Sequence, residues 1–438
     1  MHILYLFFKS LIFSTLLLLF SIVVALQLLD SYQFWTLDIH AAGPFTRLFL
    51  KLRDTSELSS NNTTTVTSDV DEQKALRFTI LHTSDLHSQF HGVGPDTMYH
   101  GADGHYARMK FAIRTLQDRL NPFATLTVDA GDWNSGTLFH LIQVSYLYPN
   151  LVPEFQFLND SLYDATILGN HEFDGNEEAL SYMIEKANRN GIRLPILSSN
   201  MYFDKPEENG EEDESGEEKK VSKSLLHDGC SRLRRHYTET CDNMRYLPTR
   251  AAQNFMGVSM NDCLNRNSDS DGVFITPYVL RELKSSAQSK RSVKVAILGV
   301  FSINAAQTSV VNRKCTRFYG SYPSVNFGEL IQAIRRRIVE LKSKHDPDVI
   351  VILNHSGEDE DERIVRSLLR WDKNSVHVHI SSHTHSVYVK RVGRAVLAQA
   401  GPYAVNLGSL QFSFDFHSRQ LTLLNEFEPV PTYFPLDS

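Results

Sequence analysis

Five short stretches of the chain share one design, in which an apolar, β-like run is followed directly by Asp, Asn or His. The clearest is 168–174, Leu-Gly-Asn-His-Glu-Phe-Asp, which follows the apolar run 163–168. The other four are 79–87, 126–132, 349–355 and 378–385. Ligands in α/β folds bind at the carboxyl ends of strands. The design therefore predicts an α/β fold in which polar side chains gather at strand ends.

Strand and helix patterns alternate over most of the chain, as in α/β proteins. Helices are expected over 106–120, 138–147, 177–190, 327–344 and 363–369. Strands are expected over 78–83, 125–128, 163–168, 195–198, 293–300, 348–353, 376–380, 395–399, 408–416 and 420–424. This alternation predicts a folded domain over 77–428 and a tail at 429–438.

The alternation breaks at about 204–275, where we expect a surface insertion. Its first part is charged and nearly free of apolar residues, which is typical of a solvated loop. Eight acids and no base lie in 207–218, so the rest of the chain is near neutral despite the net charge of −7. A nucleic-acid partner is not expected, because it would need a basic face.

The four cysteines suggest that disulfides hold this insertion. They are Cys230, Cys241, Cys263 and Cys315. Outside the cytosol an even number of cysteines favours two disulfides, here with three possible pairings. Free buried thiols are the alternative.

The N-terminal part predicts attachment to a membrane. Residues 10–29 are uncharged and mostly apolar, long enough to cross a hydrocarbon core of about 30 Å. Lys9 precedes them, which places residues 1–9 in the cytoplasm and the rest outside or in a lumen. We favour a single-pass signal anchor over a cleaved signal peptide, which would give a secreted protein. Residues 30–76 are then a juxtamembrane segment and flexible stalk.

If the chain is outside the cytosol, its glycosylation sequons can carry glycans. Asn61, Asn62 and Asn159 begin Asn-x-Ser/Thr sequences and are candidate glycan sites outside the cytosol. Asn354 fits the pattern too, but it precedes a candidate metal ligand, and we expect it to be buried and unmodified.

The polar residues at the strand ends form a mixed set of nitrogen and oxygen ligands. The candidate metal ligands are Asp85, His87, Asp132, Asn170, His355, His383 and His385. A set without sulfur suits zinc, manganese or iron better than a structural cysteine zinc site. Two divalent ions that share one carboxylate lie about 3.5–4 Å apart, and a water between them is acidified into a nucleophile for phosphorus.

His171 is interpreted as a catalytic residue instead of a metal ligand. It is adjacent to Asn170, and Asp174 is placed to hold one of its ring nitrogens. The other nitrogen can stabilise phosphoryl oxygens or protonate the leaving alkoxide. Asn170 and His171 are therefore also the expected contacts of the substrate.

As an ordered set, these motifs resemble the calcineurin-like metallophosphoesterase superfamily. The motifs are Asp85-x-His87, Gly131-Asp132, Gly169-Asn170-His171-Glu172, His355 and His383-Thr384-His385. The stretches 80–87, 169–174, 194–200, 400–403 and 407–408 resemble its 5′-nucleotidase branch. The resemblance implies a four-layer α/β/β/α sandwich with a dimetal site at the strand ends. It implies that one metal is held by Asp85, His87, Asp132 and His385, and the other by Asp132, Asn170, His355 and His383. It also implies a His171–Asp174 dyad near the phosphate.

The sequence departs from the family pattern in three ways. Ser382 replaces the usual Gly before His-x-His, and Ser84 replaces the usual Asn before the first Asp. We expect both to leave the site intact. Secreted 5′-nucleotidases also carry a C-terminal domain that stacks the base, and this sequence ends where that domain would begin. The resemblance therefore does not imply nucleotide specificity.

The sequence thus predicts a membrane-tethered, dimetal-dependent phosphoester hydrolase acting on a small phosphorylated substrate. The favoured activity is that of a 5′-nucleotidase-like phosphomonoesterase. A phosphodiesterase or pyrophosphohydrolase acting on cyclic or sugar nucleotides is the close alternative, because the same metals serve both reactions. A non-enzymatic, metal-stabilised surface protein is another alternative. A DNA nuclease is disfavoured by the anchor and by the absence of a basic face.

Overall fold

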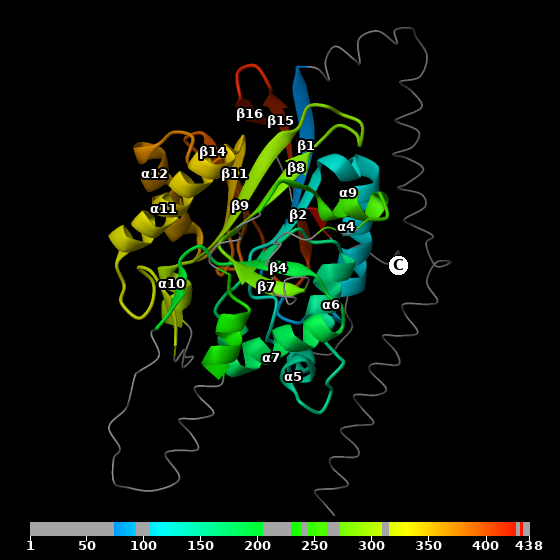
Figure 1. Cartoon of the computed structure of the whole chain (residues 1–438), viewed down its shortest axis with the longest axis vertical. Helices are drawn as coiled ribbons and strands as arrows, with labels where there is room; N and C mark the ends of the chain where they lie inside the picture. The colour runs from blue at the N-terminus through cyan, green and yellow to red at the C-terminus, as the bar shows by residue number, and fades with distance from the viewer. Residues whose placement is uncertain are drawn as a thin grey trace, which may run out of the picture. The chain divides into compact units, whose positions relative to one another are not determined.

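The computed structural model describes residues 74–92, 105–204, 229–238, 244–258, 260, 272–308, 315–425 and 430–431 (Figure 1). The expected anchor at 10–29, the stalk up to residue 73 and the acidic run 207–218 lie outside these residues, as do Asn61, Asn62, Cys241 and Cys263. Among the helices of the described ranges, none has the length and apolar character needed to cross a membrane.

One sheet joins strands from the two ends of the domain. Its order is β16-β15-β1-β2, with β17 paired to β15. The strands are β1 (Ala75–Thr83), β2 (Thr125–Asp129), β15 (Asn406–Asp415), β16 (Gln420–Leu423) and β17 (Val430–Pro431). β1 runs parallel to β2 and antiparallel to β15. The carboxyl ends of β1 and β2 therefore meet at one edge, where Thr83 pairs with Asp129.

A second sheet carries the other strand-end motifs. Its order is β13-β14-β12-β11-β9-β8-β6. The strands are β6 (Leu247–Pro248), β8 (Tyr278–Leu283), β9 (Val293–Phe301), β11 (Val349–His355), β12 (Val378–Ile380), β13 (Val387–Val392) and β14 (Ala395–Ala400). β9, β11, β12 and β14 form parallel pairs in that order along the sheet. Every residue of β11 is buried, as expected for a parallel strand covered on both faces.

Two smaller sheets complete the strands. β3 (Thr166–Ile167), β4 (Leu194–Leu197) and β7 (Val273–Thr276) pair in parallel. β5 (Met201–Phe203) pairs antiparallel with β10 (Thr316–Phe318).

Helices surround these sheets (Figure 1). They are α4 (Tyr106–Leu120), α5 (Leu138–Val144), α6 (Pro153–Asp160), α7 (Asn176–Arg189), α9 (Arg250–Phe255), α10 (Ile303–Thr308), α11 (Phe327–His345) and α12 (Glu358–Trp371), with short 3₁₀ turns η1 (Pro122–Ala124) and η2 (His171–Phe173). α11 begins after Asn326, whose side chain accepts a hydrogen bond from the Glu329 amide at 3.1 Å, as an N-cap does. It ends at His345, and the next residue, Asp346, has a left-handed conformation. The predicted apolar face of this helix is buried.

Alternate residues of the central strands point into different cores. In β1, Ile80 belongs to the cluster shared by the two large sheets, whereas Leu81 packs with residues of α4, α6 and α7. In β11, Val351 belongs to the shared cluster and Ile352 packs against α11 and α12. This is the two-residue period of a strand. The predicted mixed α/β fold with several sheets is confirmed.

The described part of the expected insertion at about 204–275 is not confined to the surface. β7 is wholly buried and pairs with β4, and Ala251 and Ala252 of α9 are buried too. These apolar runs are too short to show a periodicity in the sequence. Pairing with distant strands buries them, and that cannot be read locally. The strand expected over 163–168 is shorter in the structure, where it covers Thr166–Ile167.

Candidate functional site

Most candidate ligands lie on loops that leave the carboxyl ends of strands in the two large sheets, and His355 is the last residue of β11. β1 leads to Asp85 and His87, β2 leads to Asp132, and β12 leads to His383 and His385. All five have positive φ, between 50° and 77°. Non-glycine residues adopt this conformation rarely, and such residues cluster at functional sites.

The first group of ligand atoms comes from Asp85, His87 and His385. One donor atom from each lies within 4.8 Å of the others. The Nε2 atoms of His87 and His385 are 3.1 Å apart, and His385 Nε2 lies 3.8 Å from Asp85 Oδ1. Asp85 is fully buried, and burial raises its pKa. A buried carboxylate between two imidazoles suits a cation, which removes the cost of the buried charge.

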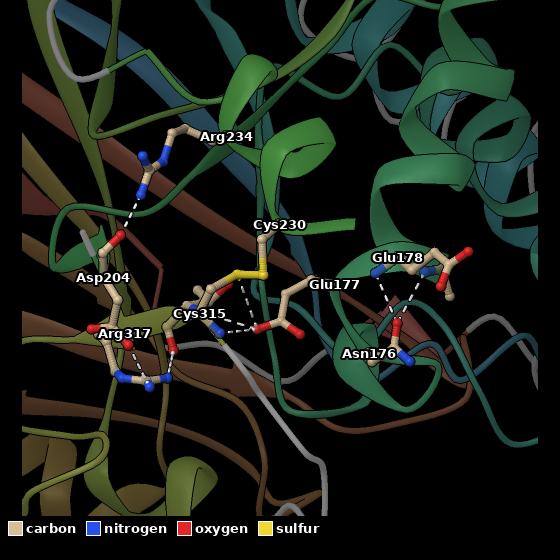
Figure 2. The surroundings of a disulfide bond; sticks show 10 residues. Asn176, Glu177, Glu178, Asp204, Cys230, Arg234, Cys315 and Arg317 are labelled. Atoms are coloured by element: carbon tan, nitrogen blue, oxygen red, sulfur yellow. Dashed lines mark hydrogen bonds and ion pairs between the residues drawn. A yellow bond between two sulfur atoms is a disulfide. The ribbon is translucent and has the colours of Figure 1, made fainter. Parts of the chain in front are cut away.

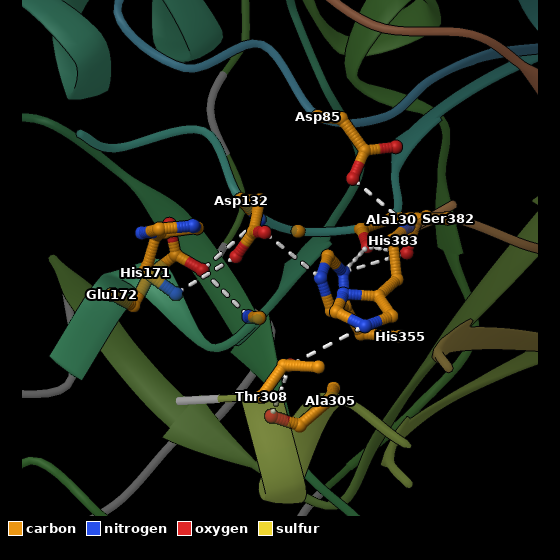
Figure 3. A network of polar contacts seen from close by, with 12 residues as sticks. Asp85, Ala130, Asp132, His171, Glu172, Ala305, Thr308, His355, Ser382 and His383 are labelled. Carbon is orange, nitrogen blue, oxygen red and sulfur yellow. Dashed lines mark hydrogen bonds and ion pairs between the residues drawn. The ribbon is translucent and has the colours of Figure 1, made fainter. Parts of the chain in front are cut away.

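A second group comes from Asp132, His355 and His383 (Figure 3). His355 Nε2 lies 3.0 Å from Asp132 Oδ2. Burial would lower the pKa of His355, but the Asp132 carboxylate outweighs it and raises this pKa to about 10. Asp132 Oδ2 also lies 3.9 Å from His87 Nε2. Asp132 is therefore a member of the second group that also lies beside the first. This is the position that a carboxylate shared by two ions would occupy.

Asn170 adds an unpaired acceptor beside these groups. Its side chain is 4% exposed, and its Oδ1 has no hydrogen-bond partner among the described residues. A buried carbonyl oxygen without a donor is costly. A divalent cation would satisfy it, so the donor set fits the metal centre that the resemblance implies.

The next residue, His171, pairs with Asp174. His171 Nδ1 lies 2.7 Å from Asp174 Oδ2, and the two side chains are 39% and 28% exposed. The hydrogen bond to Asp174 raises the pKa of His171 to about 9. The backbone amide of His171 donates to Asp132 Oδ1 at 2.9 Å. The dyad is thus tied directly to the second group.

Glu172 organises this part of the site, a role that the sequence did not indicate (Figure 3). It is fully buried. Its Oε2 accepts from the amides of Asp132 at 3.0 Å and Gly169 at 2.5 Å, and its Oε1 accepts from the Asn134 amide at 3.0 Å. Burial raises the pKa of Glu172 to about 8. One carboxyl group thus connects the loops that carry Asp132 and His171.

A buried polar network lies behind His355. Asp361 Oδ1 accepts from Asn354 Nδ2 at 2.6 Å and from Ser356 Oγ at 2.8 Å, and it lies 2.6 Å from His379 Nε2. The two residues that flank His355 are therefore both anchored to Asp361. Asn354 is fully buried, which agrees with our expectation that this sequon is buried. Asn159, another candidate glycan site, accepts hydrogen bonds from Arg193 and Arg250 through its Oδ1.

A disulfide joins Cys230 to Cys315 across 85 residues (Figure 2). Cys230 lies in the helical segment 229–235 and Cys315 directly precedes β10. Buried Glu177 accepts from the amides of Cys315 and Thr316, both at 3.1 Å. The disulfide thus fixes part of the expected insertion to the edge of the domain. It is one of the disulfides that the cysteine count predicted.

Comparison with known proteins agrees with the family resemblance of the sequence motifs. Residues 78–277 match the family model of the calcineurin-like phosphoesterases. A 131-residue segment is 37% identical to the snake venom 5′-nucleotidase of Gloydius brevicauda, covering 29% of this chain and 20% of that protein. A 132-residue segment is 36% identical to the 5′-nucleotidase of Rattus norvegicus, covering 29% and 21%. The matched segment spans about a fifth of the length of these relatives.

A solved structure extends the likeness to the fold. The calcineurin-like phosphoesterase YfkN of Bacillus subtilis is similar over 82% of this chain and 91% of that chain, with a TM-score of 0.52 and 18% identity. At this identity the similarity concerns the fold alone.

Proposed function

We propose that this chain, which carries a calcineurin-like phosphoesterase domain at residues 78–277, hydrolyses a phosphoester with the help of two divalent metal ions. The observation that carries the proposal is the position of Asp132 between two groups of ligand atoms, beside the His171–Asp174 pair. The domain limits 77–428 and the four-layer arrangement are part of the proposal. The three core clusters support that arrangement.

The assignment of ligands follows the two groups. Asp85, His87, Asp132 and His385 would hold one ion, and Asp132, Asn170, His355 and His383 would hold the other. When bound, the ions would activate water as a nucleophile and neutralise charge on the phosphoryl group. Nitrogen and oxygen donors suit zinc, manganese or iron.

His171 would supply proton chemistry. In the metal-free chain the hydrogen bond to Asp174 raises the pKa of His171 to about 9, which favours the protonated ring. Nδ1 is held by Asp174, so Nε2 keeps an N–H that can donate to a phosphoryl oxygen or protonate the leaving alkoxide. Asn170 and His171 would also orient the substrate. Asp174 keeps the ring in one orientation.

The substrate is proposed to be a small phosphorylated nucleotide, hydrolysed as a phosphomonoester. The support comes from relatives named 5′-nucleotidases. A phosphodiester or pyrophosphate remains the alternative, because the same ligand set serves both. A third proposal is a metal-stabilised surface protein without turnover.

We also propose that the catalytic domain lies outside the cytosol, tethered by residues 10–29. The Cys230–Cys315 disulfide supports this compartment. N-terminal sequencing of protein from cells tests the tether. A start near residues 27–31 would mean cleavage and secretion, whereas an intact N-terminus is expected for an anchor.

The catalytic proposal is tested with the full chain, loaded with manganese or zinc. We expect hydrolysis of at least one of three substrate classes: an aryl phosphate, a bis-aryl phosphate or a nucleotide. His171→Ala should lower the rate by about 10²- to 10⁴-fold, the usual contribution of a general acid, and Asp132→Asn should abolish it. His417→Ala, an exposed histidine in the turn between β15 and β16, is the matched control. If a folded, metal-loaded chain hydrolyses none of these substrates, the proposed enzymatic function is wrong.

A further inference from the structure

Ser382 is the residue before the His383 loop, and its hydroxyl makes three close contacts. Ser382 Oγ lies 2.7 Å from the Ala130 carbonyl oxygen and 2.6 Å from His355 Nδ1 (Figure 3). It also lies 3.1 Å from the Asn354 carbonyl oxygen. The side chain is fully buried. We propose that Ser382 is a positioning residue that fixes the tautomer and the ring orientation of His355. The inference rests on the proposed function, in which His355 is a metal ligand.

The arrangement of donors and acceptors determines the tautomer. The carbonyl oxygens of Ala130 and Asn354 can only accept, so the Ser382 hydroxyl donates its one proton to one of them. Its oxygen is then free to accept, and the donor within reach is His355 Nδ1. Nδ1 also lies 2.9 Å from the Ala130 oxygen, where two facing lone pairs would repel. His355 therefore carries a proton on Nδ1.

The consequence concerns the other ring nitrogen. Nε2 lies 3.0 Å from Asp132 Oδ2 and carries a proton of its own in the metal-free chain. A bound ion would displace that proton, and because Ser382 and the Ala130 oxygen hold the other proton on Nδ1, the Nε2 lone pair would then face the ion. This is the form that a metal ligand needs. Hydrogen bonds to the far nitrogen of a metal-bound histidine orient the ring and raise its basicity.

The backbone around His355 has other anchors besides the Ser382 hydroxyl, so the loss of this hydroxyl is expected to act mainly on the ring. Asn354 and Ser356, on either side of His355, are held by Asp361. His355 also pairs with Phe301 in the ladder between β11 and β9, so its backbone keeps these anchors without the Ser382 hydroxyl. Ser382 itself is not among the residues with positive φ, so Ala at this position introduces no backbone strain.

The test measures metal binding by the metal-free full chain. Mn²⁺ is titrated in, and the free ion is read by electron paramagnetic resonance. We expect two ions per chain for the native protein. Ser382→Ala should bind one of the two about tenfold more weakly, the usual effect of losing such a partner. Ser381→Ala is the matched control, because Ser381 is equally buried and has no hydrogen bond to His355 among the described residues.

A second variant and a second measurement separate the explanations. Ser382→Gly also lacks the hydroxyl and should weaken binding like Ser382→Ala. If only the Ala variant weakens it, the effect is steric and the inference is wrong. Nitrogen-15 NMR of His355 in the metal-free chain should show the Nδ1 proton broadened by faster exchange in both variants.

The outcomes also distinguish this inference from the proposed function. Two Mn²⁺ ions bound with unchanged affinity in Ser382→Ala overturn the role of Ser382 and leave the dimetal hydrolase standing. A native chain that binds no Mn²⁺ overturns both. Circular dichroism spectra equal to that of the native chain establish that each variant is folded.

Discussion

At the scale of single residues, the site depends on acceptors that hold its loops in place. Glu172 is the clearest case, since its two oxygens accept from three backbone amides, one of them that of Asp132. None of these amides has a partner in a strand or a helix. The Glu172 side chain therefore helps to set the positions of these three amides, and with them the position of the candidate ligand Asp132.

Replacing Glu172 should therefore damage both stability and activity. Glu172→Gln puts an NH₂ group against at least one amide donor, which leaves that buried donor unpaired. We expect a loss of about 1–3 kcal/mol in the free energy of unfolding and at least a tenfold lower kcat. Urea unfolding and steady-state kinetics measure the two effects. Glu178→Gln, on α7 and partly exposed, is the control and should change neither.

A second carboxyl group, that of Asp129, predicts a dependence of stability on pH. Asp129 is fully buried and lies near Thr83 and Thr166, whose hydroxyls donate to it at 2.7 Å and 2.8 Å. Burial raises its pKa from an ordinary value near 3.8 to about 7. The folded state then binds this proton more tightly than the unfolded state. The stabilisation is present below pH 4 and is lost as pH rises to about 7.

Asp129→Asn should remove this dependence. Urea unfolding of the metal-free chain between pH 4 and pH 8 compares the variant with the native protein. We expect the native protein to lose stability relative to the variant by up to several kcal/mol over this window, since one pKa unit is about 1.4 kcal/mol. An exposed aspartate, Asp118→Asn, should run parallel to the native protein. A constant difference between Asp129→Asn and the native protein would contradict the assignment.

At the scale of elements, the disulfide adds a covalent link between two segments that also pack against the domain, since Leu233 is buried in the core and Tyr237 donates to the Met201 carbonyl oxygen. Cys230 belongs to a helical segment between two stretches outside the described residues, and Cys315 directly precedes β10. A covalent link that closes a long loop restricts the unfolded chain. The packing of this segment is therefore expected to depend on the bond.

Breaking the disulfide should lower stability without removing the metal ligands. For an 85-residue separation we expect Cys230→Ser and Cys315→Ser each to cost about 2–4 kcal/mol in the free energy of unfolding. Urea unfolding under non-reducing conditions measures it. The double variant is the internal control and should match the single ones. Equal stability of the native and single-variant proteins would show that the bond does not form.

At the scale of the whole molecule, the candidate metal ligands come from both large sheets. Asp85 and Asp132 follow strands of one sheet, whereas His355 ends β11 and His383 follows β12 in the other. Ions bound by both sets would hold the sheets together at one edge. Metal binding should therefore stabilise the whole domain and not one loop.

Metal should raise the unfolding temperature of the full chain, and a chelator should lower it. At a free metal concentration one hundred times the Kd, one site adds about 2.7 kcal/mol. Differential scanning calorimetry with and without Mn²⁺ measures the shift. Asp132→Asn should show a much smaller shift, and His417→Ala should keep the full one. A shift of the same size in Asp132→Asn would place the ions elsewhere.

The sequence by itself determined the mixed α/β class, most of the long helices and strands, and which polar residues stand at strand ends. These features are local, because periodicity and ligand type are written in neighbouring residues. The apolar face of α11 is an example, as Leu330, Ile334 and Ile338 recur at helical spacing and are buried.

Only the tertiary structure decided which distant groups meet. It placed Glu172 under the Asp132 loop, paired Cys230 with Cys315, buried β7 within a region expected to be a surface insertion, and brought Ser382 to His355. The physical reason is the same in each case. Each of these contacts joins residues that are far apart in the chain, and several are hydrogen bonds from a loop to a distant stretch of backbone. No local sequence pattern specifies such contacts.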